Sequence, residues 1–246
     1  MNFSLKNHPF TVEAFFEFSL VLTFAVPINQ LKDLIPSCLI LDTLDDKWAF
    51  IAIAVVKTNG LRPKGFPSIF GNDFNLLGYR IFVKHTNAAG KQLRGLYILK
   101  SETDKKIMEI LGNIFTHYNY VKTDVKVVRQ KNLIEVHSLQ SGLKIVVVDG
   151  EAEVLLPINS PFADWKDARR FAGPLPFTFN YNKRTKEILT IQGVRENWIP
   201  KPVKVLINNI SYLKELGLND VVLANAFILE DIPYHWKKGR TELWHN

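Results

Sequence analysis

Long runs of strand-forming residues, each ended by proline, glycine or a polar turn, limit the folds open to this chain more than any other feature. Phe16–Val26 is rich in Phe, Val, Leu and Thr and stops at Pro27, and Trp48–Val56 is an apolar run of strand length. Phe74–Thr86 and Leu93–Lys100 flank a short polar turn and predict a β-hairpin. The first hundred residues are therefore dominated by strands.

Further strands follow along the rest of the chain, with short turns between them. They are Tyr118–Arg129, Leu133–Ser138, Gly142–Leu155, Phe177–Tyr181, Lys186–Gln192, Val203–Ile207 and Val221–Leu229. Regular strand spacing with short turns is typical of an antiparallel meander. So many strands close most easily as a barrel or cone, because closure removes exposed strand edges.

Two or three short helices accompany the strands, over Ile28–Ile35, after Ser101, and over Asp164–Phe171. The second is the clearest: Ser101 is a candidate N-cap, and Asp104 stands three residues later in capping-box spacing. An apolar stripe with helical spacing follows, and we expect it to pack in the core. Its members are Ile107, Ile110, Leu111 and Ile114. The predicted fold class is α+β, mainly antiparallel β, with a cone- or barrel-like sheet, in one domain over residues 1–246.

Composition excludes several classes of protein. The single cysteine, Cys38, rules out an intramolecular disulfide and a Cys-rich zinc site, and a reducing cytoplasm is the default compartment. The six histidines stand at no metal-ligand spacing, so we expect no metal and no cofactor. The 17 Phe against 2 Met suggest a wide core or cavity filled with aromatic rings.

Neither nucleic acid nor a membrane is an expected partner. The net charge is +7, but basic pairs are scattered and form no long run or one-sided basic helix. The longest apolar candidate for a membrane span, Phe18–Leu31, is short and contains Pro27, whereas a spanning helix needs about 20 apolar residues. Glu13 and Glu17 interrupt the stretch where the apolar core of a signal peptide would lie.

The segment between the clearest helix and the next strand holds the candidate site residues His117, Tyr118, Asn119 and Tyr120. Alternation from Val121 through Val127 sets the inward face and, extended backwards, places His117 and Asn119 inside with the two tyrosines flanking them. The alternative for His117 is a hydrogen-bonded histidine in the core or at its rim.

Two charged residues complete the candidate site. Arg80 interrupts a mostly apolar run, and an inward arginine could bind a carboxylate with two hydrogen bonds. The alternative is a salt bridge between Arg80 and Glu102 or another acid at the rim.

The sequence resembles the acetoacetate-decarboxylase-like superfamily over nearly its whole length, through many short motifs. They are HPFTVEAFFEFSLVLTFAVP (8–27), GLRPKGFP (60–67), RGLYILKSETD (94–104), FAGPLPFTFNY (171–181), GVRENWIPKPVKV (193–205) and AFILEDIPYHW (226–236). It is most similar to a bacterial branch catalogued as a domain of unknown function. The resemblance implies a cone-like or barrel-like β fold with an internal cavity. In the decarboxylases, a cavity lysine forms a Schiff base with a β-keto acid, a reaction for which the lysine is activated by burial and a cationic neighbour.

The decarboxylase residues do not carry over to this chain. The lysine pair of that family falls on Tyr118-Asn119 or Asn119-Tyr120, and neither choice supplies an amine. The family's cavity glutamate falls near Asp73. Lys100 and Lys122 are the candidates for a displaced catalytic lysine. Lys122 alternates in phase with Asp124 and Lys126, which places it on the outer face, and Lys100 stands at a strand end from which its side chain can reach water.

Three hypotheses remain open. The first is a protein that binds a small molecule, or an enzyme of unknown reaction, with an aromatic cavity for a small carboxylate or carbonyl compound. The second is a Schiff-base lyase that uses Lys100 or Lys122. The third is a structural or partner-binding domain whose cavity is filled with side chains. Under any of the three, exposed strands at the open end of the cone would favour a homo-oligomer.

Overall fold

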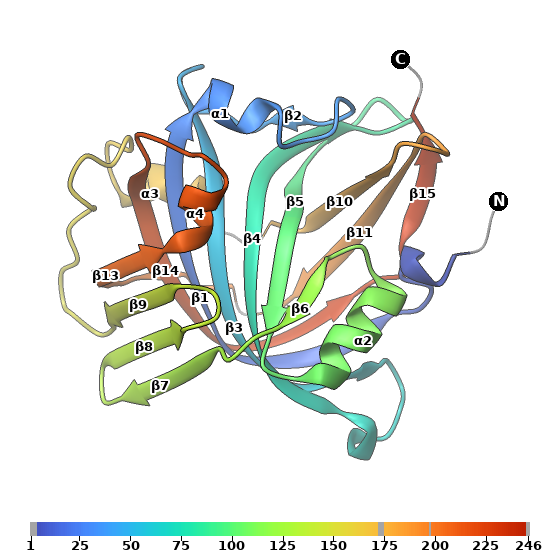
Figure 1. The fold of residues 1–246 in the computed structure, drawn as a ribbon, viewed down its shortest axis with the longest axis horizontal. Coiled ribbons are helices and arrows are strands. Elements are labelled where there is room, and N and C mark those ends of the chain that lie inside the picture. The colour runs from blue at the N-terminus through green and yellow to red at the C-terminus, as the bar shows by residue number, and fades with distance from the viewer. Residues whose placement is uncertain (1–3, 172–174, 197, 245–246) are drawn as a thin grey trace.

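Seven strands of the main sheet close into a ring, which Figure 1 shows with its elements labelled. The computed structural model describes residues 4–171, 175–196 and 198–244. The ring runs in the order β14-β1-β3-β4-β5-β10-β11 and is closed by a short pairing between β11 and β14. Its strands are β1 (Val12–Pro27), β3 (Trp48–Pro63), β4 (Asn72–Thr86), β5 (Gln92–Thr103), β10 (Phe177–Asn182), β11 (Glu187–Arg195) and β14 (Val222–Trp236). The barrel predicted from strand number is therefore confirmed.

Short strands extend this sheet, and nearly all of its pairings are antiparallel. The extensions are β2 (Ile40–Leu41), β6 (Tyr120–Lys122), β12 (Lys201–Pro202) and β15 (Arg240–Leu243). The predicted hairpin is present as β4 and β5. Two pairings are parallel, β5 with β10 and β5 with β6, because the chain crosses over before each returning strand.

A second sheet of four strands packs against the outside of the barrel, in front of β1 and β3 in Figure 1. Its strands are β7 (Lys126–Gln130), β8 (Leu133–Ser138), β9 (Leu143–Val148) and β13 (Lys204–Ile210). The continuous strand expected over Tyr118–Arg129 is wrong, because β6 pairs with the barrel and β7 with this second sheet. The predicted strand at Val203–Ile207 likewise belongs to the second sheet.

Alternation along β4 separates the inside of the barrel from its outside. Leu77, Tyr79 and Ile81 join the large core between the two sheets. Phe74, Leu76 and Phe82 belong to two clusters on the opposite, inner face, and Arg80 lies between them along the strand. One end of the interior is filled by aromatic rings in mutual contact, namely Phe50, Phe82, Phe162 and Phe171.

Four α-helices lie among the described residues: α1 (Ile28–Lys32), α2 (Lys106–Phe115), α3 (Trp165–Ala168) and α4 (Ser211–Glu215). Three single 3-10 turns accompany them, at Leu5–Asn7, Ser68–Phe70 and Arg169–Phe171. The first three α-helices match the predicted ones in position, and the fourth was not expected. No helix among the described residues combines the length and the apolar character that a membrane crossing requires.

The local predictions for α2 need correction. Ser101 does not cap this helix; it lies in β5 opposite Gly78, and Lys105 occupies the N-cap position without a side-chain hydrogen bond. Asp104 instead accepts hydrogen bonds from the backbone and side chain of Asn75. The expected burial of the stripe is also wrong. The helix buries Met108 and Gly112, while the isoleucines at 107, 110 and 114 are exposed.

Candidate functional site

The inside of the barrel encloses a small cavity of about 40 Å³ around the Arg80 side chain. Six of the seven ring strands, all except β11, contribute to its wall, which places it within the barrel. Its polar lining consists of Arg80, Ser19, Ser101, Tyr118, Tyr120, Thr178 and Tyr234. Aromatic and aliphatic side chains, among them Phe16, Leu76, Leu96 and Trp236, form the rest. We call this the inner cavity.

Arg80 has no acidic partner among the described residues. The titratable groups that act on it are the hydroxyls of Tyr118, Tyr120 and Tyr234, and burial lowers the pKa of its guanidinium. Its Nε atom is buried without a hydrogen-bond partner, and so is the Oγ atom of Ser19 in the same cavity wall. Buried polar groups in proteins are nearly always paired. Two unpaired groups that can both donate hydrogen bonds therefore line one small cavity.

Gly78 provides the space that the guanidinium occupies. A Cβ atom at this position would lie 2.8 Å from Nε and 3.0 Å from Nη2 of Arg80. Both residues are on the inner face of β4, two positions apart, so the arginine side chain lies back over the glycine. The absence of one methyl group thus fixes the direction in which the positive charge points.

The tyrosines of the cavity are seated in the same way. The Tyr120 ring lies against Gly112 of α2, whose added Cβ would be 2.3 Å from the ring, and the Tyr234 hydroxyl lies where a Cβ of Gly193 would be, 1.8 Å away. Glycine inside a helix lowers the stability of the helix by about 1 kcal/mol relative to alanine. The close contact with the Tyr120 ring explains why glycine nevertheless occupies this position. Burial raises the pKa of Tyr120 to about 12, so its hydroxyl stays a hydrogen-bond donor at neutral pH.

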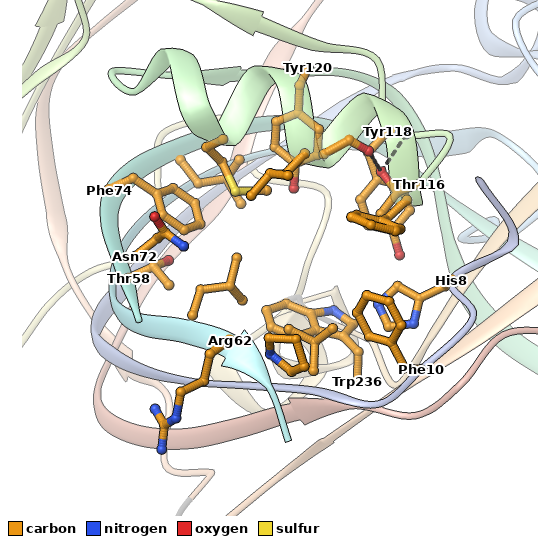
Figure 2. Close-up of a pocket in the computed structure, with 18 residues that line it drawn as sticks. His8, Phe10, Thr58, Arg62, Asn72, Phe74, Thr116, Tyr118, Tyr120 and Trp236 are labelled. Atoms are coloured by element: carbon orange, nitrogen blue, oxygen red, sulfur yellow. Dashed lines mark hydrogen bonds between the residues drawn. The ribbon is translucent and has the colours of Figure 1, made fainter. Parts of the chain in front are cut away.

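A second cavity of about 150 Å³ adjoins the first, between α2 and the beginnings of β1 and β4. We call it the outer cavity; Figure 2 shows it with α2 above. Its wall is largely apolar and includes Phe10, Val12, Leu61, Phe74, Met108, Leu111 and Phe115. Four side chains line both cavities, namely Leu76, Tyr118, Tyr120 and Trp236.

The structure separates the sequence-predicted residues of the 117–120 segment. Tyr118 and Tyr120 are buried and line both cavities, and the Tyr118 hydroxyl is 2.7 Å from the hydroxyl of Thr178. The inward placement expected for His117 and Asn119 is wrong. His117 is half-buried and contacts Asn7 at 3.3 Å, and Asn119 is exposed and donates to the carbonyl of Leu99. The reason is that the alternation of Thr123, Val125 and Val127 does not continue into β6, where Tyr120 is buried and Val121 is 42% exposed.

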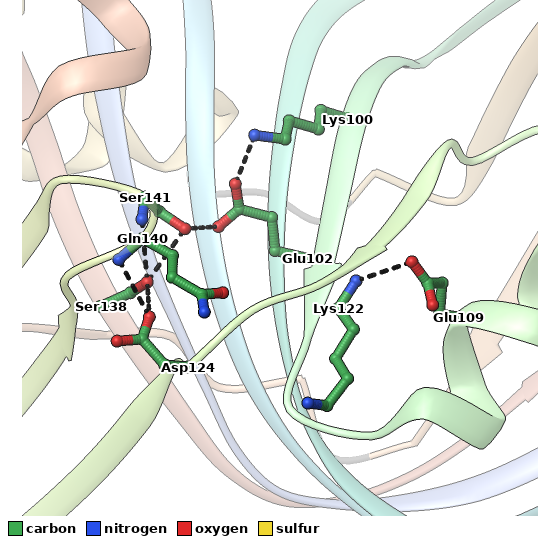
Figure 3. A network of polar contacts seen from close by, with 8 residues as sticks. All are labelled: Lys100, Glu102, Glu109, Lys122, Asp124, Ser138, Gln140 and Ser141. Carbon is green, nitrogen blue, oxygen red and sulfur yellow. Dashed lines mark hydrogen bonds and ion pairs between the residues drawn. The ribbon is translucent and has the colours of Figure 1, made fainter.

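Glu102 and Lys100 lie on the outer face of the barrel, away from Arg80. Figure 3 shows Lys100 paired with Glu102 at 2.6 Å, and Glu102 in turn accepting a hydrogen bond from Ser141. Tyr79 pairs with Lys100 across the strands, whereas Arg80 pairs with Ile98, so Leu99 is an extra residue on β5. This bulge reverses the parity, and therefore Ile98 points inward while Lys100 points outward.

Two other residues considered from the sequence, Lys122 and Asp73, line neither cavity. The side chain of Lys122 extends away from Lys100 and Glu102 in Figure 3, and its backbone N–H donates to Glu109. Asp73 is exposed and accepts a hydrogen bond from the backbone of Gly60. No lysine lines the inner or the outer cavity as formed by the described residues.

Sequence reasoning missed four polar residues of the inner cavity. These are Ser19, Ser101, Thr178 and Tyr234. The alternation of Ile232, Tyr234 and Trp236 at the end of β14 was a usable signal for the tyrosine. The sequence could not show that Ser19 and Ser101 point inward, because a bulge in β1 and another in β5 reverse the alternation of inward and outward side chains.

Solved structures of low sequence identity share this fold. An acetoacetate decarboxylase-like enzyme from Sphingomonas wittichii RW1 matches with a TM-score of 0.62 and 12% identity, over 98% of this chain and 96% of that one. The acetoacetate decarboxylase of Legionella pneumophila matches with a TM-score of 0.61 and 10% identity, over 95% and 88%. The enduracididine biosynthesis enzyme MppR, complexed with pyruvate, matches with a TM-score of 0.55 and 8% identity, over 95% and 90%.

These likenesses show the acetoacetate-decarboxylase-like fold, as the sequence motifs indicated. A comparison with curated proteins gave no match. A family model, described as an uncharacterized conserved protein, matches residues 16–238 and so covers most of the chain. The chain belongs to the DUF2071 family.

Proposed function

We propose that the protein binds a small carboxylate through Arg80 in the inner cavity. The observation that carries this proposal is a guanidinium inside the barrel with no acid near it in the part of the chain that the structure describes. Taking a charge out of water costs several kcal/mol unless a partner compensates it. A bound carboxylate would supply that partner, since the guanidinium matches its geometry with two charge-assisted hydrogen bonds.

The other groups of the inner cavity support the same ligand chemistry. The unpaired Ser19 hydroxyl and the protonated Tyr120 hydroxyl are donors, and carboxylate oxygens are acceptors. The volume of about 40 Å³ is roughly three times what one water molecule needs, which suits a carboxylate group. The two cavities favour a ligand-binding protein over a structural domain whose interior is filled with side chains. A structural neighbour, MppR, was solved with pyruvate, so pyruvate is a reasonable probe.

The first test compares ligand-induced stabilisation of the parent protein and of Arg80→Met. At a hundredfold excess over Kd, acetate or pyruvate is expected to raise the melting temperature of the parent by about 5–10 °C and that of Arg80→Met not at all. Gly78→Ala should weaken the effect while leaving the fold intact, because the added Cβ displaces only the flexible end of Arg80. Equal stabilisation of all three proteins, or of none by any small carboxylate or carbonyl compound, would contradict the proposal.

The second test addresses a Schiff-base lyase, in which Lys100 or Lys122 would attack a keto acid. Lys100 is paired with Glu102 outside the barrel, and Lys122 is exposed, so neither is a buried amine beside the cavities. We expect no irreversible mass increase after incubation with acetoacetate and borohydride. An adduct mapped to either lysine by peptide mass spectrometry would favour the lyase instead.

A further inference from the structure

The two cavities differ in chemistry, and their arrangement describes the shape of a ligand. The inner cavity, with the arginine, has room for little more than a carboxylate group. The outer cavity has about 150 Å³ and adjoins it along Leu76, Tyr118, Tyr120 and Trp236. Engineered apolar cavities of about 150 Å³ bind benzene. For a ligand whose head is at Arg80, the adjoining outer cavity is the space for an apolar tail of about that size, and the tail would pass among the four shared side chains.

The outer cavity, as lined by the described residues, holds no unpaired positive charge that would compensate a second negative charge. Arg62 is its one charged lining residue among those the structure describes, and its guanidinium points away from the cavity in Figure 2, paired with Glu13 at 2.8 Å. His8 also lines the wall; burial lowers the pKa of its imidazole, which favours the neutral form. A charged tail would therefore lose its hydration and gain at most neutral polar partners, such as His8, whose Nδ1 is buried without a hydrogen bond.

The roof of the outer cavity is adaptable in shape. Met108 and Leu111 of α2 line this cavity together with the rings of Phe74 and Trp236. Methionine fills irregular gaps and packs well against aromatic rings. The wall suits either an aromatic ring or a short alkyl chain, and hydrophobic burial would add to affinity with each methylene group.

We infer that the ligand is an amphiphilic monocarboxylate, with its acid group at Arg80 and an aryl or short alkyl tail beneath α2 against Trp236. This inference rests on the proposed function, because Arg80 is the anchor of the head group. It goes further in stating that the tail determines affinity and that dicarboxylates are rejected.

Calorimetric titration of the parent protein with sodium acetate, hexanoate, 3-phenylpropionate and adipate tests the inference. Each buried methylene is expected to increase affinity about fourfold, so hexanoate should bind on the order of 100-fold more tightly than acetate. 3-Phenylpropionate should rank with hexanoate. Adipate, which has the length of hexanoate but a second carboxylate, should bind at least about tenfold more weakly than hexanoate.

Matched variants on α2 locate the tail. Leu111→Trp fills the outer cavity and should reduce the ratio of hexanoate to acetate affinity to near one. Ile110→Trp adds the same side chain at an exposed position that lines neither cavity and should leave that ratio unchanged. Val12→Phe, which fills the cavity from β1, serves if Leu111→Trp does not fold.

The outcomes separate this inference from the proposed function. If acetate, hexanoate and adipate bind with equal affinity and their binding requires Arg80, the carboxylate-binding role of Arg80 is supported. The inference that the ligand is an amphiphilic monocarboxylate is then refuted. Retention of the hexanoate preference in both cavity-filling variants would also refute it. If no carboxylate binds the parent at all, the proposed function fails and the inference fails with it.

Discussion

Replacing Arg80 with methionine should raise the free energy of unfolding by about 1–4 kcal/mol in the absence of ligand, while removing carboxylate binding. Methionine keeps the length of the side chain and its apolar contacts but removes a charge that no described residue compensates. Most substitutions inside a protein destabilise it. A gain in stability at this position would show that the charge is retained for a ligand.

Urea denaturation followed by tryptophan fluorescence measures this effect, since the midpoint shifts while the slope stays constant when only stability changes. Arg62→Met is the matched control, because Arg62 borders the outer cavity but is paired with Glu13. It should be neutral or slightly destabilising. An Arg80→Met protein that unfolds at lower urea than the parent would mean that Arg80 supports the fold, and the anchoring role would lose its basis.

Asp42→Ala should destabilise the protein by about 3–5 kcal/mol, the largest loss we expect from a single truncation. The Asp42 carboxylate is completely buried and pairs with Arg94 at 2.5 Å and with Lys84 at 3.0 Å. Arg94 also donates to the carbonyl of Arg170 and lies over the ring of Phe171, which fills one end of the barrel. Without Asp42, two cations lose their shared partner and that end of the interior loosens.

Glu17→Ala is the control for this prediction. Glu17 pairs with Lys57 at 2.9 Å, but both side chains are more than 40% exposed, and exposed pairs contribute at most about 1 kcal/mol. Denaturant unfolding of the two variants under the same buffer conditions gives the comparison. A loss from Asp42→Ala no greater than that from Glu17→Ala would mean that Arg94 and Lys84 find other partners, and our account of this cluster would be wrong.

The barrel could be predicted because the signals for its strands and turns are local and recur along the sequence. Runs such as Phe16–Val26 and the hairpin of Phe74–Thr86 with Leu93–Lys100 carry strand propensity and turn chemistry in the residues themselves. The division into two sheets was not predicted, since no local sequence signal shows that β6 pairs with the barrel and β7 with the second sheet. That choice depends on packing between residues far apart in the chain.

The candidate site was predicted in part, and the errors share one cause. Arg80 was noticed because a charge inside an apolar run is visible without coordinates, and its place in the inner cavity agrees with the expected direction. Strand parity, however, fails wherever the backbone departs from regular extension. The interruption between β6 and β7 reverses the faces expected for His117 and Tyr118, and the bulge at Leu99 turns Lys100 away from Ile98.

The glycines at 78, 112 and 193 each stand where a methyl group would collide with a polar side chain of the interior. Under the proposed function, selectivity could therefore be changed without altering any residue that would touch the carboxylate. Adding one carbon at Gly78 would displace the flexible end of Arg80, whereas adding it at Gly112 would move the Tyr120 ring and at Gly193 the Tyr234 hydroxyl. Relatives that keep the same arginine and tyrosines but differ at these three positions should accept different acids, which makes the glycines the first places to vary in a library.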